Sequence, residues 1–143
     1  MAVERGEAPQ DGLDQVQRHF RNPPGVVQVG PGWRDLVLAC HRAVVAEFPE
    51  YELLAVKQKW ASLAFQAFPR AWERGGNWTD GECERFHALI EVFARRSETV
   101  CERCGADGSR RESRWIELVL CDPCESRVPE DGDVLRDGGA VRR

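Results

Sequence analysis

The chain has 143 residues, of which 42% are apolar, including five Trp and six Phe, and its formal net charge at pH 7 is −4. This length and composition predict one modest domain with a hydrophobic core. The negative charge argues against a protein whose whole surface binds nucleic acid electrostatically, although a local basic patch is compatible with it.

Residues 1–31 are expected to form a mostly flexible N-terminal arm, because they mix Gly, Pro, Gln and both charge signs without a sustained apolar period. Leu13, Val16 and Phe20 lie three and four residues apart. One short helical turn that docks on the domain is therefore compatible with this segment.

Two apolar stripes with helical spacing follow. The first predicts a helix that begins at Trp33 and is stopped by Pro49. Its members are Trp33, Leu36, Val37, Cys40, Val44, Val45 and Phe48. The second predicts a helix after Thr79, where a Thr-Asp-Gly-Glu segment has the spacing of a capping box. Its members are Cys83, Phe86, Leu89, Ile90, Phe93 and Ala94. Both spare cysteines, Cys40 and Cys83, are expected to pack in the core.

Between these helices the apolar period changes to two, which predicts a β-hairpin turning near Ala61-Ser62. The first strand would place Leu54, Val56, Gln58 and Trp60 on one face, and Ala55, Lys57 and Lys59 on the other. A second alternating run covers residues 63–68.

Two Cys-x-x-Cys hooks, Cys101 to Cys104 and Cys121 to Cys124, are separated by sixteen residues. This spacing predicts one structural Zn²⁺ held by four cysteines in a ribbon over residues 99–126, with a short hairpin between the hooks. Arg103, inside the first hook, is expected to offset the negative charge of the four thiolates.

Two other roles for the cysteines compete with zinc binding. A redox dithiol uses one such pair beside a parallel strand, whereas here two pairs flank a strand-like segment, residues 115–120. Structural disulfides need an oxidising compartment, but the N-terminus has no apolar signal core and no segment is long enough to span a membrane. The expected location is therefore the cytoplasm.

The expected fold class is α+β: a helix, a β-hairpin, a second helix and a C-terminal four-cysteine zinc ribbon that shares the core of the domain. The domain is expected to span residues 32–128. Residues 129–143, which are rich in Asp, Gly and Arg, are expected to form a disordered tail.

Several segments match a known pattern: Gly32-Trp33 at the start of a helix, the hairpin sequence Val-Lys-Gln-Lys-Trp-Ala-Ser-Leu-Ala-Phe over residues 56–65, and Leu120-Cys121-Asp122-Pro123-Cys124. Together they resemble a group of small, largely uncharacterised zinc-ribbon-like proteins of bacteria and their phages, in which a Gly pair stands in place of Ala61-Ser62. The resemblance covers roughly residues 32–126. It implies an architecture and a metal, and no activity.

Basic residues near the ribbon suggest a nucleic-acid contact. Arg110 and Arg111 are expected at the tip of the ribbon hairpin, where a basic loop can touch phosphate, and Lys57 and Lys59 would extend the patch. Acidic residues are interleaved with these arginines, and mixed charges are usual on a solvated surface.

Trp72 and Trp78 lie in a Gly-bearing loop, where aromatic side chains either anchor a protein partner or close over the core. The sequence shows no catalytic motif, and its three histidines stand at no spacing that dictates a catalytic triad. We therefore expect a non-enzymatic, zinc-stabilised module that binds a protein partner in a bacterial or phage cytoplasm. The alternative is a nucleic-acid-binding accessory or regulatory factor.

Overall fold

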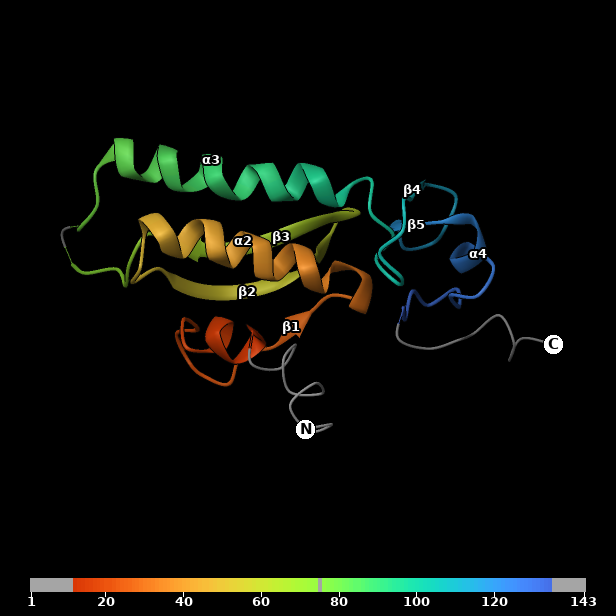
Figure 1. Cartoon of the computed structure of the whole chain (residues 1–143), viewed down its shortest axis with the longest axis horizontal. Coiled ribbons are helices and arrows are strands. Elements are labelled where there is room, and N and C mark those ends of the chain that lie inside the picture. Colours follow the sequence, from red (N-terminus) through yellow and green to blue (C-terminus); the bar gives the residue numbers. More distant parts are fainter. Residues whose placement is uncertain (1–11, 75, 135–143) are drawn as a thin grey trace, which may run out of the picture.

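The computed structural model describes residues 12–74 and 76–134 and has a mixed α+β fold (Figure 1). Its elements in chain order are β1 (Val27–Gln28), the 3-10 turn η1 (Pro31–Trp33), α2 (Arg34–Glu47), β2 (Glu52–Lys59), β3 (Ser62–Phe68), α3 (Asp80–Ser97), β4 (Ser109–Arg111), β5 (Leu118–Leu120) and α4 (Asp122–Glu125). The predicted order of helix, hairpin, helix and cysteine ribbon is confirmed.

The strands form two separate sheets. In the larger sheet the order is β1-β2-β3, with β1 parallel and β3 antiparallel to β2. The smaller sheet is the antiparallel pair of β4 and β5 in the ribbon. Helices α2 and α3 run next to each other over the larger sheet, and the ribbon lies at one end of this layered body (Figure 1).

The two predicted helices bury the predicted stripes. Trp33, Val37 and Val44 are fully buried, and the ring of Phe48 meets that of Phe86 edge-on at 5.1 Å. Helix α3 begins with the predicted capping box, in which the Thr79 side chain accepts from the Glu82 backbone and the Glu82 side chain accepts from the Thr79 backbone. These bonds satisfy backbone N–H groups that have no partner within a helix.

The two spare cysteines differ in their surroundings. Cys40 is fully buried in the core, as predicted. Cys83 is only half-buried, and its Sγ lies 3.4 Å from Nδ1 of the exposed His87 one turn along α3. Its predicted core position was wrong, because it lies at the edge of the stripe, where the helix faces solvent.

The segment from residue 12 to residue 31 packs against the domain, where the sequence predicted a mostly flexible arm. Its helical turn over residues 12–17 buries Val16, and Phe20 is buried beside Leu53 of β2. Strand β1 then adds to the edge of β2. At the other end, residues 129–134 pack on the ribbon and bury Val134. The remaining parts of the predicted arm and tail, 1–11 and 135–143, lie outside the described residues.

The hairpin turn falls one residue earlier than predicted, at Trp60-Ala61, and both of these residues have positive φ, 56° and 60°. A register irregularity between Leu53 and Ala55 shifts the first part of β2, so that Leu53 is buried and Leu54 is exposed. Trp60, predicted to share a strand face with Val56, is 77% exposed at the turn, whereas Val56 is buried. A two-residue loop ends the alternation before Trp60, so strand periodicity does not fix its direction.

Three side chains join the N-terminal segment to the core. The His19 ring stacks on Tyr51 at 4.0 Å, and His19 Nδ1 lies 2.8 Å from the Tyr51 carbonyl oxygen. The buried His41 ring shares a 2.7 Å hydrogen bond with the Tyr51 hydroxyl. Burial, assisted by the charges of His19 and Arg42, lowers the pKa of His41 to about 4.

The low pKa of His41 predicts that the protein loses stability between pH 6.5 and pH 4. In this window the unfolded chain takes up a proton at His41 and the folded chain does not, so the free energy of unfolding falls as the pH falls, by on the order of 2–3 kcal/mol. Urea denaturation at a series of pH values should show this slope. His41→Gln should flatten it, and an equal slope in both proteins would contradict the assignment.

Candidate metal centre

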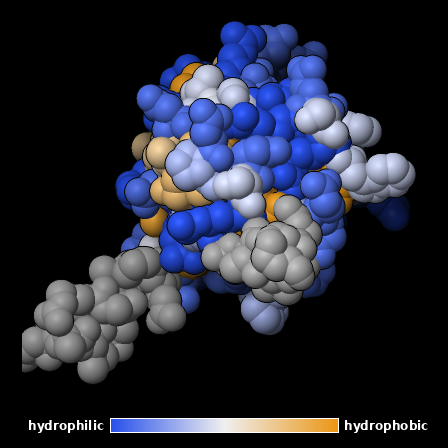
Figure 2. Space-filling view, turned by 90° about the vertical axis from the view of Figure 1, so that its right-hand side faces the viewer, coloured by the Kyte–Doolittle hydropathy of each residue, from blue (hydrophilic) through white to orange (hydrophobic). Residues whose placement is uncertain are grey.

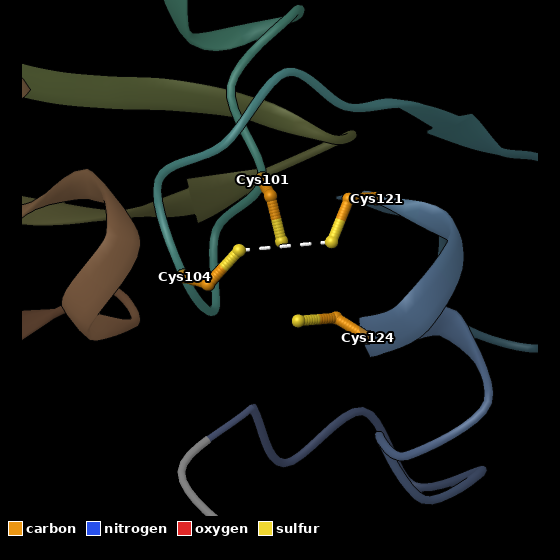
Figure 3. Close-up of side chains that lie close together, drawn as sticks. All are labelled: Cys101, Cys104, Cys121 and Cys124. Atoms are coloured by element: carbon orange, nitrogen blue, oxygen red, sulfur yellow. Dashed lines mark hydrogen bonds between the residues drawn. The ribbon is translucent and has the colours of Figure 1, made fainter.

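The four hook cysteines point toward one another (Figure 3). Their sulfur atoms all lie within 4.8 Å of one another, and Cys104 Sγ is 3.6 Å from Cys121 Sγ. Tetrahedral coordination with metal–sulfur bonds of about 2.3 Å requires sulfurs about 3.8 Å apart. All four cysteines are free thiols, so the cluster has the geometry to hold one metal ion.

Each hook is shaped by its own backbone. In the first, Gly105 N–H donates to the Cys101 carbonyl at 2.9 Å, and Gly105 has a positive φ of 87°, which glycine adopts at little cost. In the second, Cys121 is the N-cap of the short helix α4, whose turn brings Cys124 back toward Cys121. The short hairpin predicted between the hooks is confirmed as β4 and β5.

The thiols differ in how readily they ionise. Burial raises the pKa of Cys101, but the backbone N–H groups of Cys121, Cys104 and Arg103 outweigh it and bring the pKa to about 7. Burial raises the pKa of Cys124 to about 12, against the effect of the Arg103 guanidinium, which lies 3.7 Å from Cys124 Sγ. Arg103 thus contacts a metal-site sulfur, as expected. A bound cation would be needed to hold Cys124 as a thiolate at neutral pH.

The first hook rests on the segment Gly30 to Trp33. Gly32 N–H donates to the Glu102 carbonyl at 2.7 Å, and Gly30 N–H donates to the Glu102 carboxyl at 2.9 Å. The Trp33 indole N–H donates to the Val100 carbonyl at 2.7 Å. Burial raises the pKa of Glu102 to about 7, against the opposing effect of the Gly30 N–H. These bonds fix the hook to the start of α2.

The contact leaves no room for side chains at Gly30 and Gly32. A Cβ on Gly32 would lie 2.2 Å from the Cys101 carbonyl oxygen and 2.5 Å from Gly105 N. A Cβ on Gly30 would lie 2.5 Å from the Glu102 carbonyl oxygen. Both positions therefore require glycine, because the backbone of the first hook approaches them too closely for a side chain.

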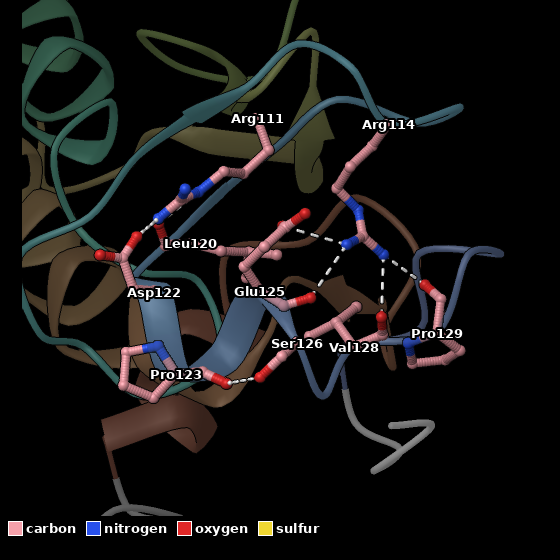
Figure 4. A network of polar contacts seen from close by, with 9 residues as sticks. All are labelled: Arg111, Arg114, Leu120, Asp122, Pro123, Glu125, Ser126, Val128 and Pro129. Atoms are coloured by element: carbon pink, nitrogen blue, oxygen red, sulfur yellow. Dashed lines mark hydrogen bonds and ion pairs between the residues drawn. The ribbon is translucent and has the colours of Figure 1, made fainter. Parts of the chain in front are cut away.

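Two predicted arginines do not lie at the ribbon tip. Arg110 and Arg111 belong to strand β4, and the loop at the tip spans residues 112–117. Arg111 donates twice to the Leu120 carbonyl and pairs with Asp122 at 2.8 Å (Figure 4). Arg110 donates to the Trp60 carbonyl at 2.6 Å and lies 3.5 Å from Glu117.

Arg114 belongs to the ribbon loop, and its side chain is buried. Its guanidinium pairs with Glu125 at 3.1 Å and donates to the carbonyls of Val128 and Pro129 (Figure 4). Its Nε has no hydrogen-bond partner within residues 12–74 and 76–134. Arg111 and Arg114 therefore tie the ribbon to α4 and to the segment after it.

The other predicted binding residues are scattered. Lys57 and Lys59 are on β2, and neither makes an ion pair with any residue that the structure describes. Trp72 is 56% exposed, whereas Trp78 stacks on Phe68 with ring centroids 5.5 Å apart. The contact of Trp78 agrees with a covering role for this side chain.

A surface that the sequence did not indicate lies between the two sheets. Trp60 at the hairpin turn and Trp115 in the ribbon loop are 77% and 89% exposed, and both line one pocket of about 380 Å³ with Ile116, Lys59 and Arg114. The sequence predicts a strand-like segment over residues 115–120, but β5 covers only Leu118–Leu120, so Trp115 and Ile116 lie in the loop.

Comparisons with protein-family models, with curated proteins and with solved structures find no match for this chain. Among the described residues, no helix is long and apolar enough to cross a membrane.

Replacing Gly32 by Ala should destabilise the protein by about 2 kcal/mol or more and weaken metal retention, since the new Cβ would push the first hook off its seat. Gly81→Ala is the matched control, because its nearest contact would be 3.9 Å away at the start of α3. Thermal denaturation and metal content should separate the two variants. Wild-type values for Gly32→Ala would refute the close contact.

Proposed function

We propose that this chain is a non-enzymatic, zinc-stabilised interaction module that binds a protein partner through the surface formed by Trp60, Trp115 and Ile116. The observation that carries the proposal is the placement of two highly exposed tryptophans at one pocket beside the metal ribbon. The resemblance to zinc-ribbon-like proteins supports a bacterial or phage setting.

Zinc is the metal that the donor set favours. Four thiolates in a tetrahedral arrangement, on two Cys-x-x-Cys hooks, are typical of structural zinc sites. Four cysteine ligands leave no open position for water or substrate, which supports a structural metal and a role without catalysis. The metal would then contribute folding free energy directly.

The purified chain should carry one zinc ion, which native mass spectrometry would read directly. Chelation should expose thiols and speed hydrogen exchange at residues 100–126, and Cys101→Ser should do likewise. Cys83→Ser is the control, because Cys83 lies outside the cluster and should leave the metal content unchanged. Masses short by two hydrogens per cysteine pair, without metal, would instead identify disulfides.

The conformation of Trp60 supports a binding role. Its φ of 56° lies in the left-handed region, which disfavours a bulky side chain relative to Asn or Gly. The side chain is 77% exposed, so burial does not compensate for this cost. Strained positions without a packing benefit are concentrated at functional sites. Trp is also enriched among the residues that dominate protein interfaces.

The metal centre and the proposed surface are physically connected. Arg110 of β4 donates to the carbonyl of Trp60, so the ribbon sheet holds the turn of the larger hairpin. Trp115 stands in the loop that joins β4 to β5, and β5 leads directly into Cys121. Loss of the metal is therefore expected to disrupt the relative positions of Trp60 and Trp115.

A photo-crosslinking amino acid at position 115 would identify the partner in an extract of the source cell, after which the purified partner is used for calorimetry. Trp60→Ala and Trp115→Ala should each weaken binding about tenfold or more, with zinc content retained. Trp72→Ala is the control, because it removes an exposed tryptophan elsewhere. Equal loss with all three variants would contradict a localised surface.

Trp60→Asn separates binding from folding. Asn tolerates the left-handed region, so this variant should raise the free energy of unfolding by about 0.5–1 kcal/mol while it loses the partner. A destabilised Trp60→Asn protein would show that Trp60 serves the fold.

A further inference from the structure

The proposed surface continues into a second hollow. The pocket at Trp60 and Trp115 shares Gln58 and Ile116 with a neighbouring pocket of about 490 Å³. That second pocket runs along β1 and β2 to the ribbon and is lined by Val26, Val29 and Leu118, among others. We call the two together the β2 groove. Figure 2 views the molecule from the ribbon end, where small apolar areas interrupt a mainly hydrophilic surface.

The β2 groove holds two lysines without an ion-pair partner among the described residues, beside the carboxyl groups of Glu117, Glu102 and Asp133. Lys57 lines the second pocket and Lys59 the first, and neither has an ion-pair partner among the described residues. Glu117, the carboxylate in the first pocket, lies 3.5 Å from Arg110. The same pocket is bounded by Arg114, whose buried Nε–H lacks an acceptor in the described part of the chain.

The residues that line the groove favour an acidic peptide over nucleic acid as the anionic partner. Nucleic acid needs a track of cations for its phosphates and aromatic faces for its bases. Here Arg111 and Arg114 are held by internal partners, so the groove offers two isolated lysines and no continuous row of cations. Aliphatic walls of Val and Leu fit apolar side chains, and two separate lysines suit single carboxylates.

We infer that the β2 groove recognises an acidic peptide segment whose large apolar side chains alternate with Asp or Glu. The apolar side chains would contact Trp60, Trp115 and Ile116, while the carboxylates would pair with Lys57 and Lys59. The chain's own residues 135–143 carry three arginines and one aspartate, which is the opposite charge sign. This inference rests on the proposed function and adds the chemistry of the partner.

Selection from a displayed library of random short peptides, on the full-length zinc-loaded protein, tests the inference. Enriched sequences should combine Asp or Glu with Leu, Ile, Phe or Trp. Their affinity, measured by fluorescence anisotropy on synthetic copies, should fall at least tenfold in Lys57→Ala/Lys59→Ala and in Trp115→Ala. The double variant Arg34→Ala/Arg42→Ala removes two exposed charges from α2, whose residues line neither pocket, and should bind as wild type.

Several results would overturn the inference: enrichment of basic or uncharged peptides, no enrichment, or undiminished affinity in the double lysine variant. Binding of an oligo-deoxythymidine probe in place of peptides would favour nucleic acid. Self-association measured by light scattering and lost in Trp115→Ala would identify a second copy as the occupant. Peptide binding that appears only after truncation at Val134 would identify the C-terminal residues instead.

Failure of this inference can be distinguished from failure of the proposed function. Suppose that binding of a crosslinked protein partner requires Trp60 and Trp115 but not the two lysines. This result would support the interaction module and refute the acidic peptide. Absence of any partner that depends on Trp115 refutes both.

Discussion

The backbone contact between the Gly30–Trp33 segment and the first cysteine hook is the constraint on which the rest of the structure depends. Glu102 accepts hydrogen bonds from Gly32 and Gly30, and its own N–H donates to the Val119 carbonyl. One residue of the hook thus joins the start of α2 to the ribbon strand β5. Because the two backbones touch, glycine is required, and any side chain there would separate the hook from the domain.

This contact explains why the cysteine ribbon is part of the domain. Strand β5 alternates between two clusters: Val119 packs into the main core, whereas Leu118 and Leu120 pack around the cysteines. Alternate side chains of a strand point to opposite faces, so a three-residue strand connects both clusters. Free energy gained by binding a metal at the cluster would therefore be shared with α2 and the larger sheet and would not be confined to the hooks.

The same connection places the exposed aromatics. Trp60 and Trp115 come from different sheets, and the hydrogen bond from Arg110 to the Trp60 carbonyl joins those sheets at the surface. The arginines that the sequence suggested for nucleic-acid binding serve the internal structure. Arg111, for example, donates to the Leu120 carbonyl and forms an ion pair with Asp122. Charge count alone overstates a basic surface when guanidinium groups are held by internal acceptors.

The sequence by itself determined the two helices, the hairpin and the four-cysteine cluster, because helical spacing, strand alternation and hook spacing are local patterns. It did not determine that Gly30 and Gly32 contact the backbone of the first hook, that residues 12–31 pack on β2, or that Trp60 and Trp115 share a pocket. Those facts join residues far apart in the chain. Only the tertiary structure decided them, since they depend on how close two backbones approach and on which side chains are left without a neighbour.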